Sequence, residues 1–374
     1  MKDLKTCREE IDAIDQQIIA LFEKRMNVAK DVVTYKKAHD MEIFQSAREA
    51  QVIEKNVNRI HNDELKPYAA LYIQDMMNIS KSYQATFVEA KTSDIHLCTP
   101  KTKDIVVGFQ GVPGSFSESA LENYFGKETN RKNYQHFEDV YKALQNDEID
   151  YGVVPLENSS TGAINDNYDL IRKYDFYIVG EQSLSISQHL LGVKGSRIED
   201  LKEVYSHPQG LLQCAHFFSE HPDIQPKDYI NTAVSAKYVA SQNNPHLGAI
   251  ASLQAAELYH LDVLAKDIQD NQNNKTRFII FSKQLEKNNE ATCVSIVFTT
   301  QHKVGALYEV MKTIKDHQIN LLRIESRPLL NQPWEYYFYV DFEGNIEDTN
   351  ILLALEDMKA HTNTLRVLGS YAKK

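Results

Sequence analysis

The sequence has few cysteines, and their spacing does not suggest a metal site or a disulfide framework. Cys7, Cys98, Cys214 and Cys293 lie far apart, and no two of them form a C-x-x-C pair. Isolated cysteines of this kind are typical of reduced thiols in a cytoplasmic protein and argue against a structural zinc site. We therefore expect no metal centre.

Long hydrophobic runs are also missing. No stretch of 18 apolar residues occurs, and the N-terminal Met-Lys-Asp-Leu-Lys-Thr has no apolar signal region. These absences predict a cytoplasmic protein that does not enter a membrane. A net charge of -11 argues against nucleic acid as the main partner, while local cationic pockets would still admit acidic small molecules.

The chain lacks a dinucleotide-binding fingerprint. The glycines of residues 108–114 are spaced G-x-x-G-x-x-G instead of G-x-G-x-x-G, and Pro113 lies within the loop. This spacing argues against a nicotinamide cofactor, and we expect no cofactor of any kind. The loop and Ser115 can still present backbone amides and a hydroxyl to a carboxylate at a helix start.

What is present predicts a multidomain globular protein of 374 residues, of which 42% are hydrophobic and 10% aromatic. The texture of the sequence changes along the chain. We predict an all-α domain over 1–90, a linker over 91–103, a two-lobed α/β domain over 104–284, a second linker over 285–290 and an α+β domain over 291–374.

Residues 4–37 contain no glycine or proline and predict one long amphipathic helix. Arg25 stands at a position of its apolar seam, where a guanidinium is costly unless an anion pairs with it. Lys36, eleven residues on, lies about 20° round the helix, so both side chains could reach one anion. Two further helices are expected, from about Ser46 and after Pro67. Few, long helices make a thin core, which favours an intertwined dimer.

This region resembles the AroQ class of chorismate mutases over its whole length, although each cation alone could equally be a solvated surface residue. The resemblance implies a rearrangement of chorismate to prephenate, which requires a held dicarboxylate and a stabilised ether oxygen. It implies that Arg8 of a partner subunit, Arg25 and Arg48 bind the substrate. Lys36 and Gln84 would donate to the ether oxygen, and Glu49 would take the ring hydroxyl. The matching residues are Arg8, Arg25, Lys36, Arg48, Glu49, Ser80 and Gln84, and Gln45 departs from the Asp common in relatives.

Beyond the first linker, short apolar runs alternate with helical patterns and predict a mainly parallel sheet, followed by a second α/β unit. The expected strands are 105–109, 149–155, 176–180, 203–206, 247–251 and 276–281, with helices over 116–125, 163–174, 209–220 and 233–241. Two lobes with a cleft between them follow from this order. Residues 151–166 end a strand at Pro155 and then crowd polar side chains together, which indicates either a ligand site or a surface turn.

Four motifs occur in the order of prephenate dehydratases, and the region resembles that family. They are residues 111–117 (Gly-Val-Pro-Gly-Ser-Phe-Ser), 151–166, 206–209 (Ser-His-Pro-Gln) and 274–278 (Asn-Lys-Thr-Arg-Phe). The resemblance implies that prephenate loses its ring hydroxyl and a carboxylate together, driven by aromatisation. Gly210 departs from the alanine that is more common after His-Pro-Gln.

That reaction needs a proton donor at the leaving hydroxyl. By resemblance Thr276 is the first candidate, as a hydrogen-bond donor or proton relay, and Glu157 is the alternative acid if burial raises its pKa. A structural role stays open for each of three residues. Thr276 could simply begin a strand, Arg277 could be a structural salt-bridge partner, and His207 could pack at a helix end. The residues assigned to the substrate are Ser115, Asn158, Ser159, Thr161, Ser206, His207, Gln209, Arg277 and Phe278.

The last part of the chain has the order strand, helix, strand, strand, helix, strand, which is ferredoxin-like. It resembles an ACT regulatory domain in Gly305-Ala306-Leu307 and in Glu325-Ser326-Arg327-Pro328. The resemblance implies feedback by L-phenylalanine bound between paired ACT domains. Free amides at a helix start suit the carboxylate of this effector, and Glu325 or nearby carbonyls suit its ammonium group.

Taken together, the three resemblances imply a bifunctional enzyme of phenylalanine biosynthesis that converts chorismate through prephenate to phenylpyruvate. We expect a homodimer or homotetramer. Two alternatives stay open. One is a chorismate mutase fused to a non-catalytic ligand-sensing module, and the other is a mutase–prephenate dehydrogenase, which would need NAD.

Overall fold

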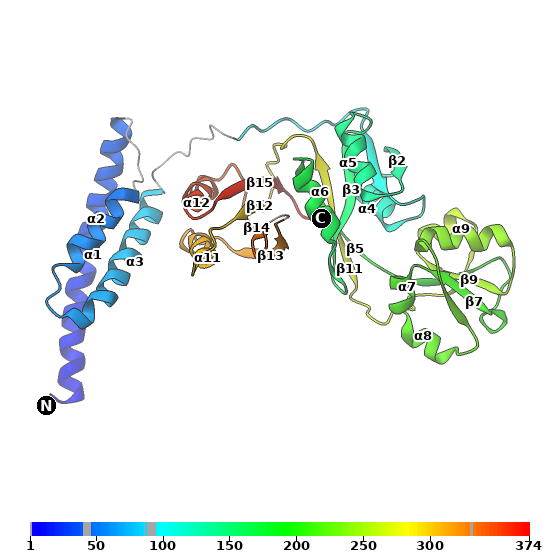
Figure 1. The fold of residues 1–374 in the computed structure, drawn as a ribbon, viewed down its shortest axis with the longest axis horizontal. Coiled ribbons are helices and arrows are strands. Elements are labelled where there is room, and N and C mark those ends of the chain that lie inside the picture. Colours follow the sequence, from blue (N-terminus) through cyan, green and yellow to red (C-terminus); the bar gives the residue numbers. More distant parts are fainter. Residues whose placement is uncertain (1, 40–45, 86, 88–94, 330–331) are drawn as a thin grey trace. The chain divides into compact units, whose positions relative to one another are not determined.

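The structure is a computed structural model that describes residues 2–39, 46–85, 87, 95–329 and 332–374 (Figure 1). Its contacts divide the chain into two compact units. The first comprises Met1–Asp94, Thr300–Leu321 and Ile346–Thr364, and the second comprises Ile95–Thr299, Leu322–Asn345 and Leu365–Lys374. Within the described part of the chain, no helix is both long enough and apolar enough to cross a bilayer.

The N-terminal part of the first unit is helical, as predicted. Its elements are α1 (Leu4–Ala38), α2 (Ser46–Val57), the short 3-10 helix η1 (Asp63–Leu65) and α3 (Lys66–Ala85). Asp3 caps α1 by accepting a hydrogen bond from the backbone N–H of Thr6 at 2.7 Å. Both α1 and α2 pack against α3, and the buried side chains of α1 are Met26, Ala29 and Val33.

Two more helices of the first unit come from the end of the chain, α11 (Ala306–Asp316) and α12 (Thr349–Lys359). They pack on each other around the buried His317, which follows α11. The imidazole of His317 lies 2.9 Å from the Asp357 carboxylate and 3.1 Å from the Asn350 side chain. This buried histidine is therefore hydrogen-bonded through both ring nitrogens.

In the second unit, the first lobe of the α/β region contains a five-stranded sheet in the order β5-β11-β3-β1-β2. Helices α4 (Phe116–Phe125), α5 (Phe137–Gln145) and α6 (Asn165–Lys173) pack on it. The strands are β1 (Val106–Gln110), β2 (Asn130–Tyr134), β3 (Tyr151–Asn158), β5 (Tyr177–Ser185) and β11 (Lys275–Ser282), with the short β4 (Gly162–Ala163) paired to β3.

The prediction of a mainly parallel sheet is wrong. β1 is parallel to β2 and β3, but β11 is antiparallel to both β3 and β5. The reason lies in the path of the chain. It leaves the first lobe through β5 and returns through β11 after the second lobe is complete, so these neighbouring strands run in opposite directions.

The second lobe contains a separate five-stranded sheet with the order β10-β6-β9-β7-β8. Its strands are β6 (His189–Gly192), β7 (Glu203–Ser206), β8 (Gln225–Asp228), β9 (Leu247–Ala251) and β10 (Asp262–Ala265). Its helices are η2 (Ile198–Asp200), α7 (Pro208–Leu212), α8 (Ala215–Glu220), α9 (Thr232–Gln242) and α10 (Leu253–Leu258). The single helix predicted over 209–220 is therefore two helices, because Asp270 accepts hydrogen bonds from the first backbone amides of α8, Ala215 and His216, at 3.1 and 3.0 Å.

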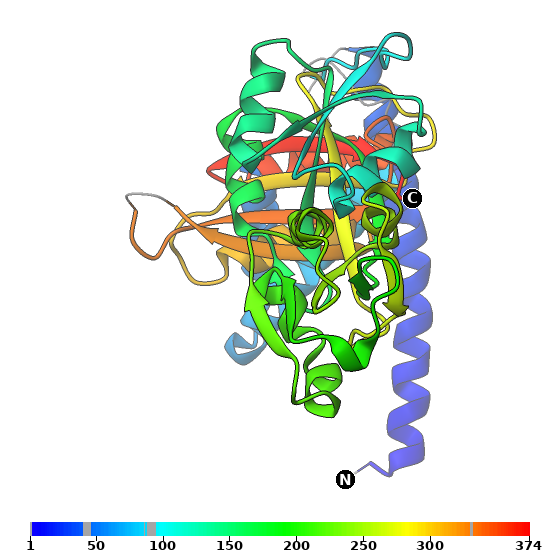
Figure 2. The ribbon, with the colours of Figure 1, turned by 90° about the vertical axis from the view of Figure 1, so that its right-hand side faces the viewer.

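The last four strands continue the sheet of the first lobe, in the order β13-β14-β12-β15 and then β5. They are β12 (Cys293–Thr299), β13 (Leu321–Pro328), β14 (Tyr336–Glu343) and β15 (Thr364–Tyr371), and they run side by side in Figure 2. Gly369 makes the join to β5 possible, because a Cβ there would lie 2.1 Å from the carbonyl oxygen of Ile178.

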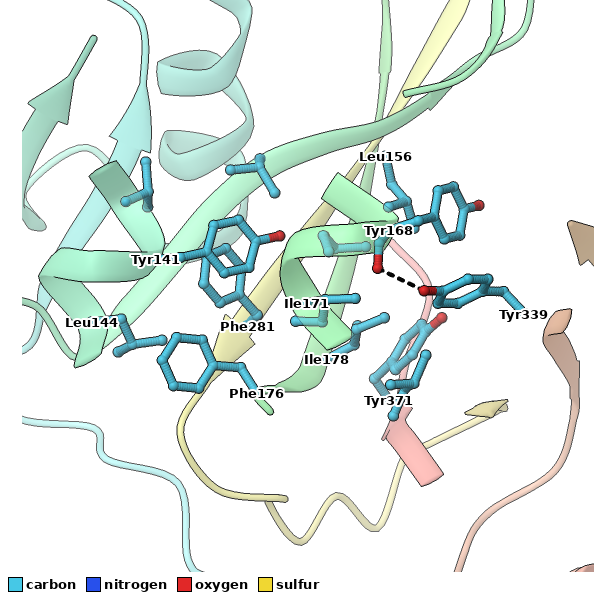
Figure 3. Close-up of a cluster of buried hydrophobic side chains, with 14 of the residues drawn as sticks. Tyr141, Leu144, Leu156, Tyr168, Ile171, Phe176, Ile178, Phe281, Tyr339 and Tyr371 are labelled. Atoms are coloured by element: carbon cyan, nitrogen blue, oxygen red, sulfur yellow. Dashed lines mark hydrogen bonds between the residues drawn. The ribbon is translucent and has the colours of Figure 1, made fainter. Parts of the chain in front are cut away.

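The two faces of β11 carry different cores. Phe278 and Ile280 pack with α4 on one face, whereas Ile279 and Phe281 pack on the other with residues of α5, α6 and the C-terminal strands. Figure 3 shows part of that second core, where the Tyr339 hydroxyl donates to the carbonyl of Tyr168 at 2.9 Å. The face of β11 opposite α4 is therefore packed by α5, by α6 and by side chains of the C-terminal strands together.

Candidate active sites

In the helical region, Arg25 is held against α3. Its guanidinium donates to the Ser80 hydroxyl and, at 3.4 Å, to the Met76 carbonyl. Burial lowers the pKa of Arg25, and Tyr72 offsets part of this effect, so the net shift is downward. A guanidinium nevertheless remains charged at neutral pH. The structure thus brings together Arg25 and Ser80, two of the residues that the mutase resemblance selects.

Gln84 and Lys36 lie further along the same pair of helices. Gln84 donates to the carbonyl of Ala29 at 3.2 Å, and Lys36 is half-buried on α1. Eleven residues of helix place Lys36 about 16 Å along the axis from Arg25, so only their long side chains could reach one ligand. The side chains of Arg48 and Glu49 lie outside those that the structure describes, as does Gln45.

Arg8 cannot meet Arg25 within one copy of α1. Seventeen residues of helix separate the two by about 25 Å, and the Arg8 side chain is exposed. The apolar stripe around Arg8 is exposed as well. Its exposed fractions are 67% at Leu4, 55% at Ile11, 55% at Ile14, 41% at Ile18 and 64% at Leu21.

In the α/β region, Thr276 and Asn158 form a buried hydrogen-bonded pair across β11 and β3. The Asn158 amide donates at 2.8 Å to the Thr276 hydroxyl oxygen and at 2.8 Å to the Asn274 side-chain oxygen. The Asn158 oxygen accepts from the backbone amides of Ser160 and Thr161 at 2.9 and 3.1 Å. These contacts fix the orientation of the amide, so its NH2 group must face Thr276.

The exposed residues after Asn158 close the end of β3. Ser159 exchanges backbone and side-chain hydrogen bonds with Lys275, at 2.8 and 2.9 Å, and the Thr161 hydroxyl lies 3.4 Å from the Asn158 oxygen. The cluster is therefore built from the end of β3 and the start of β11, which the sequence motifs 151–166 and 274–278 supply. Phe278 lies in the core under α4.

Residues of the second lobe have local partners. Ser206 is buried at the end of β7 and donates to the Ile250 carbonyl at 2.8 Å. His207 caps α7, and its ring accepts from the Gln209 backbone amide at 3.2 Å. Both His207 and Gln209 are exposed at the helix start, so the helix-cap role of His207 is present in the structure.

The loop of residues 111–117 contacts the second lobe directly, which the sequence did not predict. Ser252 donates to the Gly114 carbonyl and Tyr259 to the Pro113 carbonyl, both at 2.9 Å. Gly114 has φ +86°, and a Cβ there would lie 3.1 Å from Cα of Ala255. Ser115 caps α4, with its hydroxyl 3.4 Å from the Glu118 amide. This loop therefore joins the two lobes.

Glu157 and Arg277 lie on the face of the sheet opposite Asn158 and Thr276. They are direct cross-strand neighbours, as are Asn158 and Thr276, and successive side chains of a strand point to opposite faces. Glu157 forms an ion pair with Arg323 of β13. Burial raises the pKa of Glu157, Arg277 lowers it, and Asp341 and Glu181 raise it further.

This position argues against Glu157 as the acid that acts beside Thr276, because its carboxylate is engaged behind the sheet. Arg277 is likewise surrounded by protein groups and is 8% exposed. Sequence reasoning missed Arg323 and Asp341, their partners on the C-terminal strands. The available signals were a charged residue in each strand: Arg323 within Leu321–Ile324 of β13, and Asp341 within the tyrosine-rich strand β14.

The residues selected for phenylalanine belong to both compact units. Gly305 is the N-cap of α11 in a left-handed conformation, with φ +77°, and Ala306 and Leu307 begin that helix. Glu325, Ser326, Arg327 and Pro328 end β13, where Arg327 donates to Asp169 at 2.8 Å.

Comparisons with known proteins distinguish the same two regions of the chain. A model of "Chorismate mutase type II" matches residues 7–85, and one of "Prephenate dehydratase" matches residues 107–286. The bifunctional chorismate mutase/prephenate dehydratase of Aquifex aeolicus is 33% identical over 374 residues, which cover 100% of this chain and 99% of that protein.

Two further relatives each match somewhat more than two thirds of the chain. Arogenate dehydratase 2 of Petunia hybrida is 38% identical over 281 residues, or 71% of each chain. The crystal structure of prephenate dehydratase from Arthrobacter aurescens in complex with L-Phe has a TM-score of 0.66 and 29% identity, and covers 72% of this chain and 90% of that one. The helical region and the two-lobed α/β region thus occur together in relatives of the same length. The chain belongs to the bifunctional chorismate mutase/prephenate dehydratase family.

Proposed function

We propose that the helical region rearranges chorismate to prephenate and that the Asn158–Thr276 pair carries the conversion of prephenate to phenylpyruvate. The observation that supports the second step best is the fixed Asn158 amide, which fills an acceptor position of the Thr276 hydroxyl oxygen. With that position occupied, the hydroxyl proton is free to point to another acceptor.

Prephenate then becomes aromatic by losing two groups. The ring hydroxyl departs as water after it receives a proton, and the ring carboxylate departs as carbon dioxide and leaves its electron pair in the ring. The Thr276 hydroxyl donates to the departing oxygen, and the Asn158 N–H stabilises negative charge that develops on the Thr276 oxygen. A neutral hydroxyl is a weak acid, so Thr276 serves as a hydrogen-bond donor, or as a relay that passes on a proton and takes one back from solvent.

The other residues that the dehydratase resemblance selects come from both lobes. We assign binding of the remaining parts of prephenate to Ser115, Ser159, Thr161, Ser206, His207 and Gln209. Glu157 and Arg277 lie behind the sheet, and we give them a positioning role instead of contact with the substrate.

The mutase step requires a second copy of the chain. A dimer that pairs α1 with its copy would cover the exposed apolar stripe and would bring Arg8 of the partner to Arg25. Arginines suit the two carboxylates of chorismate, because each guanidinium can donate two parallel hydrogen bonds. Lys36 and Gln84 would donate to the ether oxygen, with Arg48 and Glu49 on α2 completing the site.

The C-terminal part supports a regulatory role. Its element order β12-α11-β13-β14-α12-β15 and its strand order are those of a ferredoxin-like fold. They support our proposal of an ACT domain over 291–374, after a mutase domain over 1–90 and a dehydratase domain over 104–284. We propose that L-phenylalanine binds between the ACT domains of two paired copies, through residues Gly305–Leu307 and Glu325–Pro328, and inhibits the dehydratase. Unchanged inhibition in both Gly305→Val and Ser326→Ala variants would contradict this placement.

The test of the function uses the purified protein of 374 residues in neutral aqueous buffer without added metal or NAD. Chorismate should yield prephenate and then phenylpyruvate, and added prephenate should yield phenylpyruvate directly. Formation of prephenate alone would support the alternative of a mutase fused to a ligand sensor.

A second candidate substrate for the α/β region is arogenate, which carries an amino group where prephenate carries a ketone. The 38% identity to a plant arogenate dehydratase favours testing it. Competition between the two substrates at equal concentration decides the preference. We expect prephenate to be preferred, because the helical region of the same chain produces it.

A further inference from the structure

A partly buried cluster of charged side chains lies directly behind the Asn158–Thr276 pair. It consists of Glu157 of β3, Glu181 of β5, Arg277 of β11, Arg323 of β13 and Asp341 of β14, which we call the rear charge cluster. Its members come from the dehydratase strands and from the C-terminal strands of the same compact unit. The cluster thus joins two parts of the chain to which we have given different functions.

Arg277 stands at the centre of the rear charge cluster. Its guanidinium donates at 2.6 Å to Glu181, at 2.8 Å to Asp341 and at 2.8 Å to the Tyr371 hydroxyl. Burial alone lowers the pKa of Arg277, but its anionic neighbours outweigh this effect and raise the pKa, so the group stays charged. Ser295 donates to the second oxygen of Asp341 at 2.5 Å. These contacts leave Arg277 little freedom to move.

Arg323 completes the cluster from β13. It forms an ion pair with the Glu157 carboxylate, and its other terminal nitrogen lies 3.8 Å from Asp341. Its side chain is 26% exposed and that of Glu157 is 32% exposed, so the pair is partly screened from water. Three carboxylates face two guanidinium groups, and Glu157 has Arg323 as its ion-pair partner. Removal of Arg323 would therefore affect Glu157 first.

Two members of the rear charge cluster, Glu157 and Arg277, are next in sequence to the two residues that we place in catalysis. Glu157 precedes Asn158 on β3, Arg277 follows Thr276 on β11, and the two strands pair in exact register at both positions. A shift of Glu157 rotates the peptide that carries Asn158, whose amide in turn sets the direction of the Thr276 hydroxyl. Hydrogen-bonded groups in such a network act together and not additively.

We propose that Arg323 is a positioning residue for the dehydratase, which holds the strand pair β3–β11 from behind, and that it carries the effect of an amino-acid effector bound on β13 to the Asn158–Thr276 pair. This inference rests on the proposed function. The effector residues Glu325–Pro328 begin two positions after Arg323 on the same strand, so a displacement of the end of β13 moves Arg323 as well.

The chain provides a matched control in Arg366 of β15. This arginine also reaches from a C-terminal strand to the dehydratase region, where it contacts Asp175 at 3.0 Å and the Phe176 carbonyl at 2.8 Å. Its side chain is 23% exposed, close to the 26% of Arg323. Asp175 follows α6 and is not part of β3 or β11. Loss of Arg366 therefore removes a contact between the C-terminal strands and the dehydratase region, but it leaves the contacts of the catalytic strand pair β3–β11 in place.

The experiment compares the full-length Arg323→Gln, Glu157→Gln and Arg366→Gln variants with the wild type. We measure mutase activity, dehydratase kcat and KM with prephenate, phenylalanine binding by calorimetry, and inhibition by phenylalanine. We expect Arg323→Gln and Glu157→Gln to lower dehydratase kcat by at least about fivefold with KM and mutase activity unchanged, the order of magnitude of coupling in a contacting network. Phenylalanine should still bind to Arg323→Gln but should inhibit it much less.

The controls separate the possible failures. A wild type that makes no phenylpyruvate overturns the proposed function, whereas an active wild type with an equally active Arg323→Gln variant overturns only this inference. Equal losses in Arg323→Gln and Arg366→Gln, or loss of phenylalanine binding itself in Arg323→Gln, would show a merely structural role and would also overturn it. Arg323→Lys keeps the charge and should recover part of kcat and of the inhibition. If Arg323→Gln does not fold, the isosteric Glu157→Gln variant decides, because it breaks the same ion pair.

Discussion

Replacement of Arg277 by methionine tests whether the rear charge cluster holds the dehydratase sheet together. Arg277 is 8% exposed and makes contacts of 2.6 to 2.8 Å with Glu181, Asp341 and Tyr371. Its removal leaves two largely buried carboxylates without their main cation. Loss of one partner of a buried pair costs about 3–5 kcal/mol, and we expect a value in this range.

The assay is hydrogen exchange of peptides from β11 and β5 under native conditions, which gives the free energy of opening for this sheet. Lys359→Met serves as a control, because the Lys359–Glu356 pair is exposed at 51% and 67% and such pairs contribute at most about 1 kcal/mol. The double variant Arg277→Met/Glu181→Leu should recover part of the loss, since an apolar replacement removes the stranded charge. A loss below about 1 kcal/mol in Arg277→Met would refute the reasoning.

Three further predictions concern single positions. Gly114→Ala should lower dehydratase activity, because its Cβ would press on Ala255 at 3.1 Å. Gly126→Ala is the control and should not lower the activity, because Gly126 also has a positive φ, of +97°, but has open space around it. Equal effects of the two variants would contradict the contact between the lobes. Burial lowers the pKa of His189 from 6.5, so His189 of the unfolded chain takes up a proton at a higher pH than His189 of the folded chain. The free energy of unfolding should therefore fall as the pH drops below about 6.5. In denaturation measured at several pH values, His189→Gln should lose this dependence of the free energy of unfolding on pH. Cys214 is fully buried, and burial raises its pKa to about 12. Mass spectrometry should therefore find Cys214 unlabelled by iodoacetamide at pH 8 until the protein unfolds. Rapid labelling of the folded protein would contradict the packing around Cys214.

Elements with strong local patterns were predictable from the sequence. The helix α1 follows from the absence of glycine and proline over residues 4–37, and β7 and β9 match the predicted limits because short apolar runs end at polar residues. The edge strand β2 was missed, because Asn130–Tyr134 is polar and shows no alternation. The break before α8 was missed too, since Asp270 caps that helix from a distant loop.

The candidate site was predictable only in part. The sequence placed polar residues after Pro155 and at the start of β11, and the family resemblance selected Thr276 and Asn158. Their mutual hydrogen bond depends on the antiparallel register of β3 and β11, which follows from a chain path through a whole second lobe. The pairing of Glu157 with Arg323 joins residues far apart in the sequence, and no local pattern signals it.

The most direct test of the account is the rate of phenylpyruvate formation from prephenate by Thr276→Val, with Thr276→Ser and wild type beside it. Valine has the shape of threonine but lacks the hydroxyl, and positioned proton donors contribute roughly 10²–10⁴-fold to a rate. We predict that Thr276→Val loses at least about 100-fold in dehydratase kcat while its mutase activity is unchanged and Thr276→Ser retains most of its rate. A Thr276→Val enzyme that forms phenylpyruvate as fast as the wild type would contradict the account.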